Sequence, residues 1–259
     1  MNKNIRRILL LLTIPFVGLL LKELLLFVGL NEDIIIYDFI SKILIRCVLA
    51  IIVLYLIIKW GYGTFLKQFK NILISGLILL PIVYFSFQHV QYEIDNAELT
   101  IGFVENILYF TSTFATGLYE ELLFRILGFS LIFNYFKNKK ENLFKSVILT
   151  SLLFGIAHFI NLFKITSFTI IIQVLIAMGF GLLLQSLLLR FKNIFIVIII
   201  HTLINYLGMY RYYLGFPASI NEVDDSSGFI GSLIWTIIIL VCFVIPLSYL
   251  ILKPVIRNR

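Results

Sequence analysis

The chain has 259 residues, of which 61% are hydrophobic and 14% charged, and its formal net charge is +7. A soluble domain carries roughly 45–50% apolar residues and about 25% charged ones. The surplus of apolar side chains cannot be hidden in one water-soluble core. Composition therefore excludes a cytosolic enzyme, a disulfide-stapled secreted domain and a disordered chain, and it predicts a polytopic membrane protein.

Eight apolar segments are candidates for membrane-spanning helices, each of which needs about 20 residues. They cover residues 8–30, 34–58, 71–88, 101–136, 144–160, 165–189, 193–213 and 229–252. The alternating ten-residue segments of a membrane β-barrel are absent from the sequence. The sequence therefore predicts an all-α fold with about eight transmembrane helices, forming a single transmembrane domain over residues 1–259.

The loops between these segments alternate in charge. Those on one side, together with both chain ends, hold 15 of the 21 basic residues, whereas the intervening loops are acidic. Since cytoplasmic loops are enriched in Lys and Arg, both termini are expected on the cytoplasmic side of the cell membrane. The basic loops carry no aromatic pattern suited to nucleic acid, so the expected partners are the lipid bilayer and a membrane-associated substrate.

The fourth segment, residues 101–136, is too long for one perpendicular crossing. Its 36 residues would extend about 54 Å as a helix, against a hydrocarbon core of about 30 Å. The first half contains Glu105 and a cluster of hydroxyl residues. We expect part of this half at the outer interface, and residues 117–136 to cross the membrane.

Ionisable residues inside spans are costly and are by default candidates for function. One group lies in the first two spans: Lys22, Glu23, Asp38, Lys42 and Arg46. This group is interpreted mainly as structural pairing near the outer leaflet, with a cavity-lining role as the alternative. A second group lies in the fourth, fifth and seventh spans: Glu120, Glu121, Arg125, His158, His201 and Asn205.

The spacing of the second group indicates a shared site. Glu121 and Arg125 are four residues apart, so they lie on one helix face, and the same holds for His201 and Asn205. Arg125 would neutralise Glu121, which leaves Glu120 as a general base towards water.

The histidines and the asparagine complete the hypothesis. His158 would relay the proton, and His201 with Asn205 would donate hydrogen bonds to an oxyanion. These parts describe water-activated hydrolysis of a carbonyl compound. Zinc held by Glu120, His158 and His201 is the alternative, although the sequence has no His-Glu-x-x-His pattern. The metal-independent version is favoured, so no cofactor is expected.

Three motifs on separate spans resemble a known family. Glu120-Glu121-Leu122-Leu123-Phe124-Arg125 is similar to EExxxR, Phe154-Gly155-Ile156-Ala157-His158 to FxxxH, and His201-Thr202-Leu203-Ile204-Asn205 to HxxxN. These are the motifs of the CAAX-protease and bacteriocin-processing family of intramembrane proteases, also called the CPBP or abortive-infection family. The resemblance covers a catalytic core of about residues 100–210.

The resemblance implies an eight-helix intramembrane endopeptidase in which Glu120 and His158 activate water, while His201 and Asn205 stabilise the oxyanion. The family also includes bacteriocin self-immunity proteins, so a non-enzymatic immunity or scaffold protein is the alternative. The composition, rich in Ile, Lys, Asn and Phe, is typical of a low-GC bacterium. We therefore expect a bacterial plasma membrane and a membrane-associated peptide or protein as substrate.

Overall fold

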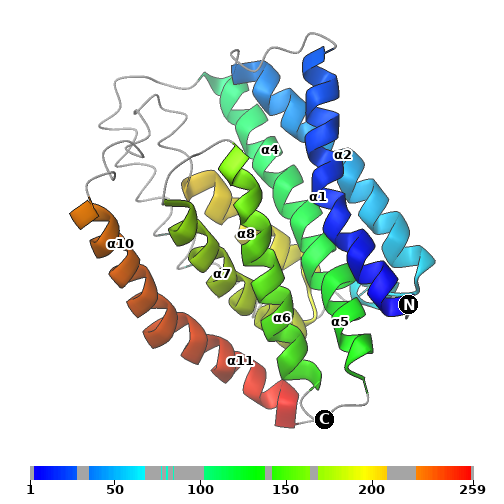
Figure 1. Cartoon of the computed structure of the whole chain (residues 1–259), viewed down its shortest axis with the longest axis vertical. Coiled ribbons are helices and arrows are strands. Elements are labelled where there is room, and N and C mark those ends of the chain that lie inside the picture. The colour runs from blue at the N-terminus through cyan, green and yellow to red at the C-terminus, as the bar shows by residue number, and fades with distance from the viewer. Residues whose placement is uncertain are drawn as a thin grey trace. The chain divides into compact units, whose positions relative to one another are not determined.

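The computed structural model describes residues 3–27, 35–67, 77, 80, 84, 102–137, 142–163, 169–208 and 226–257. Within these ranges every regular element is a helix (Figure 1). The α-helices are α1 (Lys3–Phe27), α2 (Ile35–Lys59), α4 (Phe103–Glu120), α5 (Phe129–Tyr135), α6 (Asn142–Ala157), α7 (Thr169–Phe191), α8 (Ile194–Gly208), α10 (Ser226–Ile239) and α11 (Ile245–Arg257). Two π-helical stretches, η2 (Glu121–Gly128) and η4 (Leu240–Val244), and two 3₁₀ turns, η1 (Gly63–Lys67) and η3 (His158–Phe163), complete them.

The predicted all-α membrane fold is confirmed. Among the described residues, five helices are long and apolar enough to cross a membrane: Ile5–Leu25, Ile36–Lys59, Asn142–Leu162, Ile170–Phe191 and Ile230–Arg257. A shorter apolar helix covers Ile194–Gly208. Most of the third predicted span, 71–88, lies outside the described residues, so the number of eight spans stays a prediction.

The chain divides into two compact units, each described by itself below. The first unit contains Met1–Leu127 and Asn193–Phe216, and the second contains Gly128–Lys192 and Pro217–Arg259. The first unit therefore holds α1, α2, η1, α4, most of η2, and α8. The second holds α5, α6, η3, α7 and the α10–η4–α11 helix. The prediction that residues 1–259 form one transmembrane domain stays a prediction.

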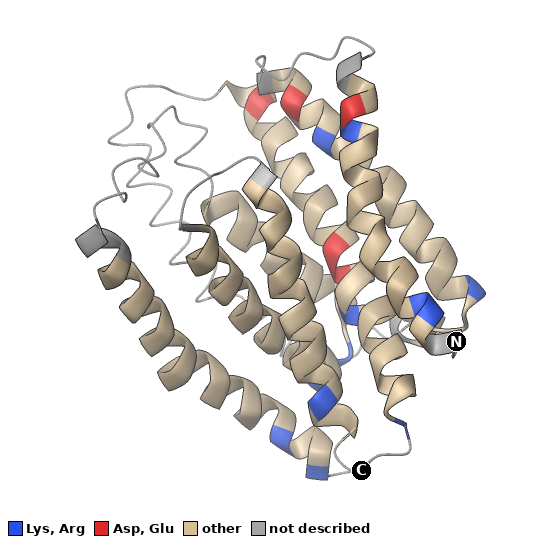
Figure 2. Cartoon of the chain, viewed as in Figure 1, with Lys and Arg blue, Asp and Glu red and all other residues tan. Residues whose placement is uncertain are grey.

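In the first unit, α1 and α2 pack as an antiparallel pair. A Cβ atom added to Gly18 on α1 would lie 3.1 Å from the Leu49 side chain on α2, so the helices approach closely there. At one end of the pair the Arg7 guanidinium lies 4.6 Å from the centre of the Trp60 ring. Figure 2 shows acidic residues gathered at the opposite end of α1, α2 and α4. Basic residues lie beside them on α1 and α2, and the orientation of the chain in the membrane stays a prediction of the sequence.

Helix α4 packs between α2 and α8. Its Tyr109 ring lies 5.6 Å from the ring of Phe39 on α2 and 4.9 Å from that of Tyr206 on α8. Gly117 has no side chain where α4 faces α8, and a Cβ atom added there would lie 3.0 Å from the Thr202 hydroxyl of α8. Small residues let membrane helices approach closely. This close packing brings the second half of α4 against the middle of α8.

The residues from Phe103 to Tyr135 are helical without a break, through α4, η2 and α5. The division of this segment into an interfacial first half and a membrane-crossing second half, residues 117–136, stays a prediction. Ser112 and Thr113 are buried, and their hydroxyls donate to carbonyls one turn earlier. Internal hydrogen bonding of this kind lets a hydroxyl lie inside an apolar helix bundle.

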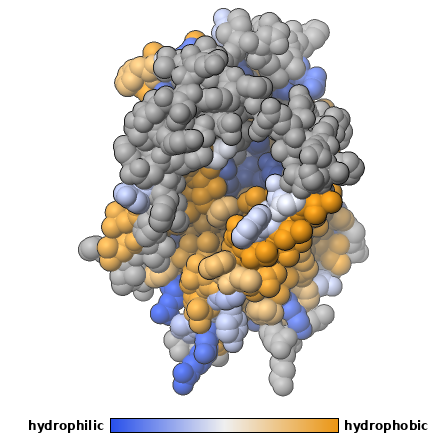
Figure 3. Space-filling model, turned by 90° about the vertical axis from the view of Figure 1, so that its left-hand side faces the viewer, coloured by the Kyte–Doolittle hydropathy of each residue, from blue (hydrophilic) through white to orange (hydrophobic). Residues whose placement is uncertain are grey.

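In the second unit, α6 packs closely on α7. A Cβ atom added to Gly181 of α7 would lie 3.0 Å from the Cα atom of Ser151 on α6. The outward side chains of α10, η4 and α11 are mostly large and hydrophobic, for example Trp235, Phe243 and Leu250. Figure 3 shows hydrophobic side chains over much of this side of the molecule. Such a surface fits acyl chains rather than water.

Replacement of Gly155 by Ala tests the packing of α6 on α7. The new methyl group would lie 2.8 Å from the carbonyl oxygen of Val174, which is backbone and cannot rotate away. We expect a loss of about 1–3 kcal/mol in the free energy of unfolding, measured by thermal unfolding in detergent. Gly231→Ala is the matched control, because no atom lies within 4 Å of its added Cβ atom. Equal melting temperatures for both variants would contradict this packing.

Candidate active site

The two adjacent carboxylates lie where the helix changes its type. Helix α4 ends at Glu120, and the π-helical stretch η2 begins at Glu121. π-helical turns are rare and occur frequently at functional sites. The motif with the spacing EExxxR is therefore placed at an irregular point of an otherwise continuous helix.

Glu121 is held from two sides in the interior of the first unit. Its Oε2 accepts a hydrogen bond from Arg125 Nε at 2.9 Å, and its Oε1 lies 2.7 Å from His201 Nδ1. Glu121 and Arg125 have no exposed surface, and His201 is 5% exposed. A buried ion pair is tolerated only when its partners compensate each other's loss of water. The Arg125 guanidinium therefore forms a buried ion pair with Glu121, and the Glu121 carboxylate accepts the Nδ1–H of His201.

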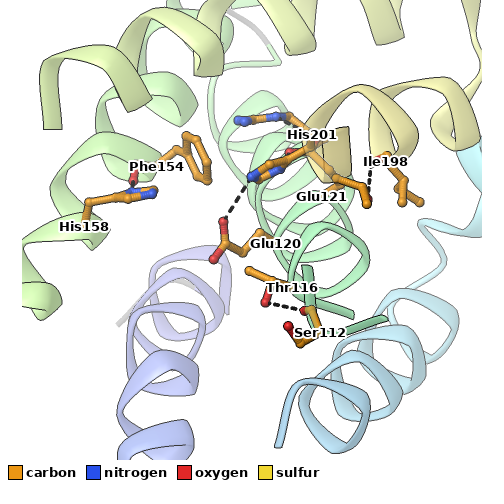
Figure 4. Close-up of polar contacts among 10 residues, drawn as sticks. Ser112, Thr116, Glu120, Glu121, Phe154, His158, Ile198 and His201 are labelled. Carbon is orange, nitrogen blue, oxygen red and sulfur yellow. Dashed lines mark hydrogen bonds and ion pairs between the residues drawn. The ribbon is translucent and has the colours of Figure 1, made fainter. Parts of the chain in front are cut away.

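Glu120 faces the other nitrogen of the same imidazole. Its Oε2 lies 3.6 Å from His201 Nε2, which is an ion-pair distance longer than a normal hydrogen bond. The Glu120 side chain is 15% exposed, whereas that of Glu121 is fully buried. Figure 4 shows the two carboxylates on opposite sides of the His201 ring. The two neighbouring glutamates thus have different environments.

The charge on His201 decides what this cluster can do. Since Glu121 takes the Nδ1–H, a neutral His201 has a lone pair on Nε2, and only a doubly protonated ring has an Nε2–H to donate. Two carboxylates and Arg125 leave one negative charge. A doubly protonated His201 makes the cluster electrically neutral, and it also supplies the donor that an oxyanion needs.

The last two turns of α8 are tied to α4 by tyrosines. Tyr109 is buried, and its hydroxyl lies 3.2 Å from the carbonyl oxygen of Asn205 and 2.5 Å from that of Tyr206. The Tyr206 hydroxyl in turn donates to Asn106 Oδ1 at 2.6 Å. Carbonyls at the end of a helix lack partners within the helix. The tyrosines therefore anchor the part of α8 that carries Asn205, one turn after His201.

His158 lies in the second unit. Its Nδ1 is 2.8 Å from the carbonyl oxygen of Phe154, and its ring meets the Phe154 ring edge to face at 4.9 Å (Figure 4). Because a carbonyl oxygen only accepts, Nδ1 is the donor, and the lone pair of a neutral ring lies on Nε2. The FxxxH spacing thus orients His158 through both the carbonyl and the ring of Phe154.

The first unit brings together four of the six predicted residues, namely Glu120, Glu121, Arg125 and His201, with Asn205 one turn further along α8. His158 belongs to the other unit. The sequence interpretation missed the contact between Glu121 and His201, and it missed Tyr109. Both contacts join residues 80 or more positions apart, so no local pattern indicates them.

The geometry also bears on a metal. In the part of the chain that the structure describes, no group of three or more His, Cys, Asp and Glu side chains could hold a metal ion. Glu120 Oε2 and His201 Nε2, 3.6 Å apart, would suit two ligands of one zinc ion, since tetrahedral bonds of about 2.0–2.1 Å place their ligand atoms roughly 3.3 Å apart. Catalytic zinc needs a third protein ligand. The first unit therefore supplies two of the three residues of the zinc alternative.

Comparison with known families identifies the segment that carries these motifs. Residues 102–207, which are less than half of the chain, match the sequence model of the family described as type II CAAX prenyl endopeptidase Rce1-like. The chain carries an Rce1-like segment. The resemblance stated from the three motifs is thereby confirmed. No curated protein and no solved structure matches the chain.

All six predicted site residues fall inside the Rce1-like segment. The family is a protease family, and the helices of this protein are apolar enough to cross a membrane. Together these findings support a peptidase that works in a membrane.

Replacement of Glu121 by Gln tests its structural role. The variant keeps an acceptor for His201 but leaves the buried charge of Arg125 without compensation. Breaking a buried ion pair costs about 3–5 kcal/mol, so we expect a loss of this order in thermal or denaturant unfolding. Glu120→Gln, at a partly exposed neighbour, should cost less than about 1 kcal/mol. A Glu121→Gln variant as stable as Glu120→Gln would contradict the role of the Glu121–Arg125 pair.

Tyr109→Phe tests the anchoring of α8. The change keeps the aromatic packing but removes the donor to the carbonyls of Asn205 and Tyr206, which should cost about 1–2 kcal/mol of unfolding free energy. Tyr55→Phe is the control, since the Tyr55 side chain is 57% exposed. Unfolding curves that coincide for the two variants would show that the Tyr109 hydroxyl does not stabilise the fold.

Proposed function

We propose that the protein is an intramembrane endopeptidase that hydrolyses a peptide bond in a membrane-associated peptide or protein. The observation that carries the proposal is that Glu120 and Glu121 differ in burial and in their polar contacts. Arg125 and His201 both contact Glu121. Glu120 keeps some exposed surface and, among the described residues, has one polar contact, at 3.6 Å with His201. Glu120 is therefore the carboxylate that remains available to water.

In the proposed reaction, Glu120 takes a proton from a water molecule while the water oxygen attacks the carbonyl carbon of the scissile peptide bond. The carbonyl oxygen becomes an oxyanion. The proton then passes, through Glu120 and His158, to the nitrogen of the leaving amine as the C–N bond breaks. General acid–base catalysis of this kind typically contributes about 10²- to 10⁴-fold to the rate.

The oxyanion would accept hydrogen bonds from His201 Nε2–H and from the Asn205 side-chain amide. The contact of Nδ1 with Glu121 supports this role, because it fixes the ring and directs Nε2 towards the side of Glu120. The Tyr109 hydroxyl supports it further, because it holds the turn of α8 that carries Asn205. Donors that are fixed before the reaction stabilise developing charge most effectively.

His158 completes the proposal from the second unit. Its Nδ1–H donates to the Phe154 carbonyl oxygen, so a neutral ring has Nε2 free to accept the proton. Once protonated, His158 would then donate its Nε2 proton to the nitrogen of the leaving amine. An imidazole suits this relay because one ring nitrogen can accept a proton and then donate it.

A zinc-dependent version of the same reaction is the second candidate. The contact between Glu121 and His201 Nδ1 favours it, since metal-binding histidines commonly donate their other N–H to a carboxylate. Glu120, His158 and His201 would hold the ion, which would polarise the attacking water. The role of Glu121 as the partner of His201 Nδ1 is the same in both versions.

The substrate follows from the chemistry of the membrane rather than from the family's description, which names CAAX prenyl endopeptidases. For this chain we propose a membrane-associated peptide or protein segment, with no requirement for a prenyl group. The basic chain ends would face the cytoplasm, with the chain in a bacterial plasma membrane.

The test is cleavage of membrane-associated peptides by the purified full-length protein. We expect Glu120→Gln to lower kcat/KM by about 10³-fold or more without changing the melting temperature, because only the base is removed. Lys59→Gln, at the far end of α2, serves as the active control. Full cleavage by Glu120→Gln would contradict the proposal.

Two further outcomes separate the alternatives. Loss of cleavage on treatment with a zinc chelator, followed by recovery with added zinc, would establish the metal-dependent version. No cleavage by the folded wild-type protein, together with immunity that survives Glu120→Gln in cells, would instead establish the non-enzymatic role.

A further inference from the structure

Arg46 is a charged residue in the apolar middle of α2. It lies about eleven residues, or roughly 16 Å, from the first residue of that helix. Its side chain is half-buried. It lies outside the Rce1-like segment of residues 102–207, so the family motifs assign it no role. A guanidinium at this depth needs a partner, because lipid cannot solvate it.

Two other cations of this unit have carboxylate partners. Lys42 Nζ lies 2.5 Å from Asp38 Oδ2, and Arg125 Nε lies 2.9 Å from Glu121 Oε2. Throughout the described parts of the chain, no carboxylate oxygen lies within ion-pair distance of Arg46. Its positive charge is therefore not compensated there by an acidic side chain.

The Arg46 guanidinium lies against Tyr119. Its central carbon is 5.1 Å from the centre of the Tyr119 ring, which is a cation–π distance. The Tyr119 side chain is 2% exposed, and its hydroxyl has no hydrogen-bond partner among the described residues. A buried hydroxyl without a partner is unfavourable. Two hydrogen-bond donors, one of them charged, thus lie at one place, and the described residues supply no acceptor for the Tyr119 hydroxyl.

This place adjoins the proposed catalytic base. Tyr119 directly precedes Glu120 on α4, and α2 packs against α4 along this stretch. We propose that Arg46 and the Tyr119 hydroxyl bind a carboxylate of the peptide substrate, and that this contact selects which peptide bond reaches Glu120. The inference rests on the proposed function, and it names the chemical class of substrate.

A carboxylate fits this pair in charge and shape. It carries one negative charge, which matches one guanidinium, and it accepts two N–H bonds from the guanidinium edge in one plane. The guanidinium carbon lies 5.1 Å from the centre of the Tyr119 ring, so a carboxylate bound by Arg46 would lie beside the same tyrosine. A carboxylate oxygen also accepts an O–H donor, which would satisfy the Tyr119 hydroxyl. The carboxylate is either the C-terminus of the peptide or an Asp or Glu side chain.

The experiment measures binding of fluorescent apolar peptides to full-length protein in lipid nanodiscs. The protein carries Glu120→Gln, so that no peptide is consumed. Four peptides of one parent sequence are compared: a free C-terminal acid without acidic side chains, its C-terminal amide, the amide with one internal Glu, and the amide with Gln at that position. Fluorescence anisotropy gives each Kd.

We expect at least one carboxylate-bearing peptide to bind about 10-fold or more tightly than its neutral partner. Addition of Arg46→Gln should abolish that ratio by weakening only the carboxylate-bearing peptide, about 10- to 100-fold in Kd. The free acid and the internal Glu distinguish the two sources of the carboxylate. A ratio that is the same with and without the Arg46→Gln substitution would overturn the inference.

Three variants guard against a general loss of structure. Tyr119→Phe removes only the hydroxyl that has no described partner, so the protein should remain folded while the ratio falls about 3- to 10-fold. Arg46→Lys keeps the charge and should retain part of the ratio. Lys59→Gln removes another cation of α2 that lies over a tyrosine, 5.2 Å from the Tyr55 ring centre, and should change nothing. If Tyr119→Phe leaves the ratio of the two Kd values unchanged, the Tyr119 hydroxyl does not contact the carboxylate.

The outcomes also separate this inference from the proposed function. Cleavage that depends on Glu120 but shows no carboxylate preference dependent on Arg46 would refute the inference alone. Carboxylate binding that depends on Arg46, in a folded protein that cleaves no peptide, would support the site and refute the peptidase.

Discussion

The contact on which this site depends is the buried ion pair between Glu121 and Arg125, extended by His201. Neither carboxylate nor guanidinium has exposed surface, so each is tolerated only because the other is present. The same carboxylate also accepts the Nδ1–H of a histidine 80 residues later in the chain. One side chain therefore joins the π-helical turn after α4 to the middle of α8, and it determines the orientation of the imidazole.

The direction of His201 Nε2 towards Glu120 follows from that arrangement. If Glu121 were the working carboxylate, the reaction would have to break the ion pair that stabilises the fold. A reaction at Glu120 leaves that ion pair intact, because the Glu120 carboxylate lies 3.6 Å from His201 Nε2 and keeps some exposed surface. Tyr109 and Gly117 contribute by holding α4 and α8 close together. Tyr119 directly precedes Glu120, and its ring lies 5.1 Å from the Arg46 guanidinium, which places a positive charge near the same turn of α4.

The amino-acid sequence predicts those features that depend on one helix at a time. Apolar segments predict the spanning helices, and a four-residue spacing predicts that Arg125 neutralises Glu121. The contact between Glu121 and His201 depends on how α4 packs against α8, and nothing in the local pattern of either helix indicates it. The same is true of Tyr109, whose partners lie on α8. The burial of Ser112 and Thr113 is likewise not indicated by the local pattern, because it depends on hydroxyls that donate hydrogen bonds to carbonyls of their own helix.

The central claim is that Glu121 is a structural counter-charge, whereas Glu120 performs the chemistry. The most direct measurement is peptide cleavage by the double variant Glu121→Gln, Arg125→Met. It removes both buried charges together, so no ion remains without compensation, and Gln still accepts the Nδ1–H of His201. We predict a folded protein with measurable cleavage that is lost again when Glu120→Gln is added. A folded double variant that is as inactive as Glu120→Gln alone would contradict the account.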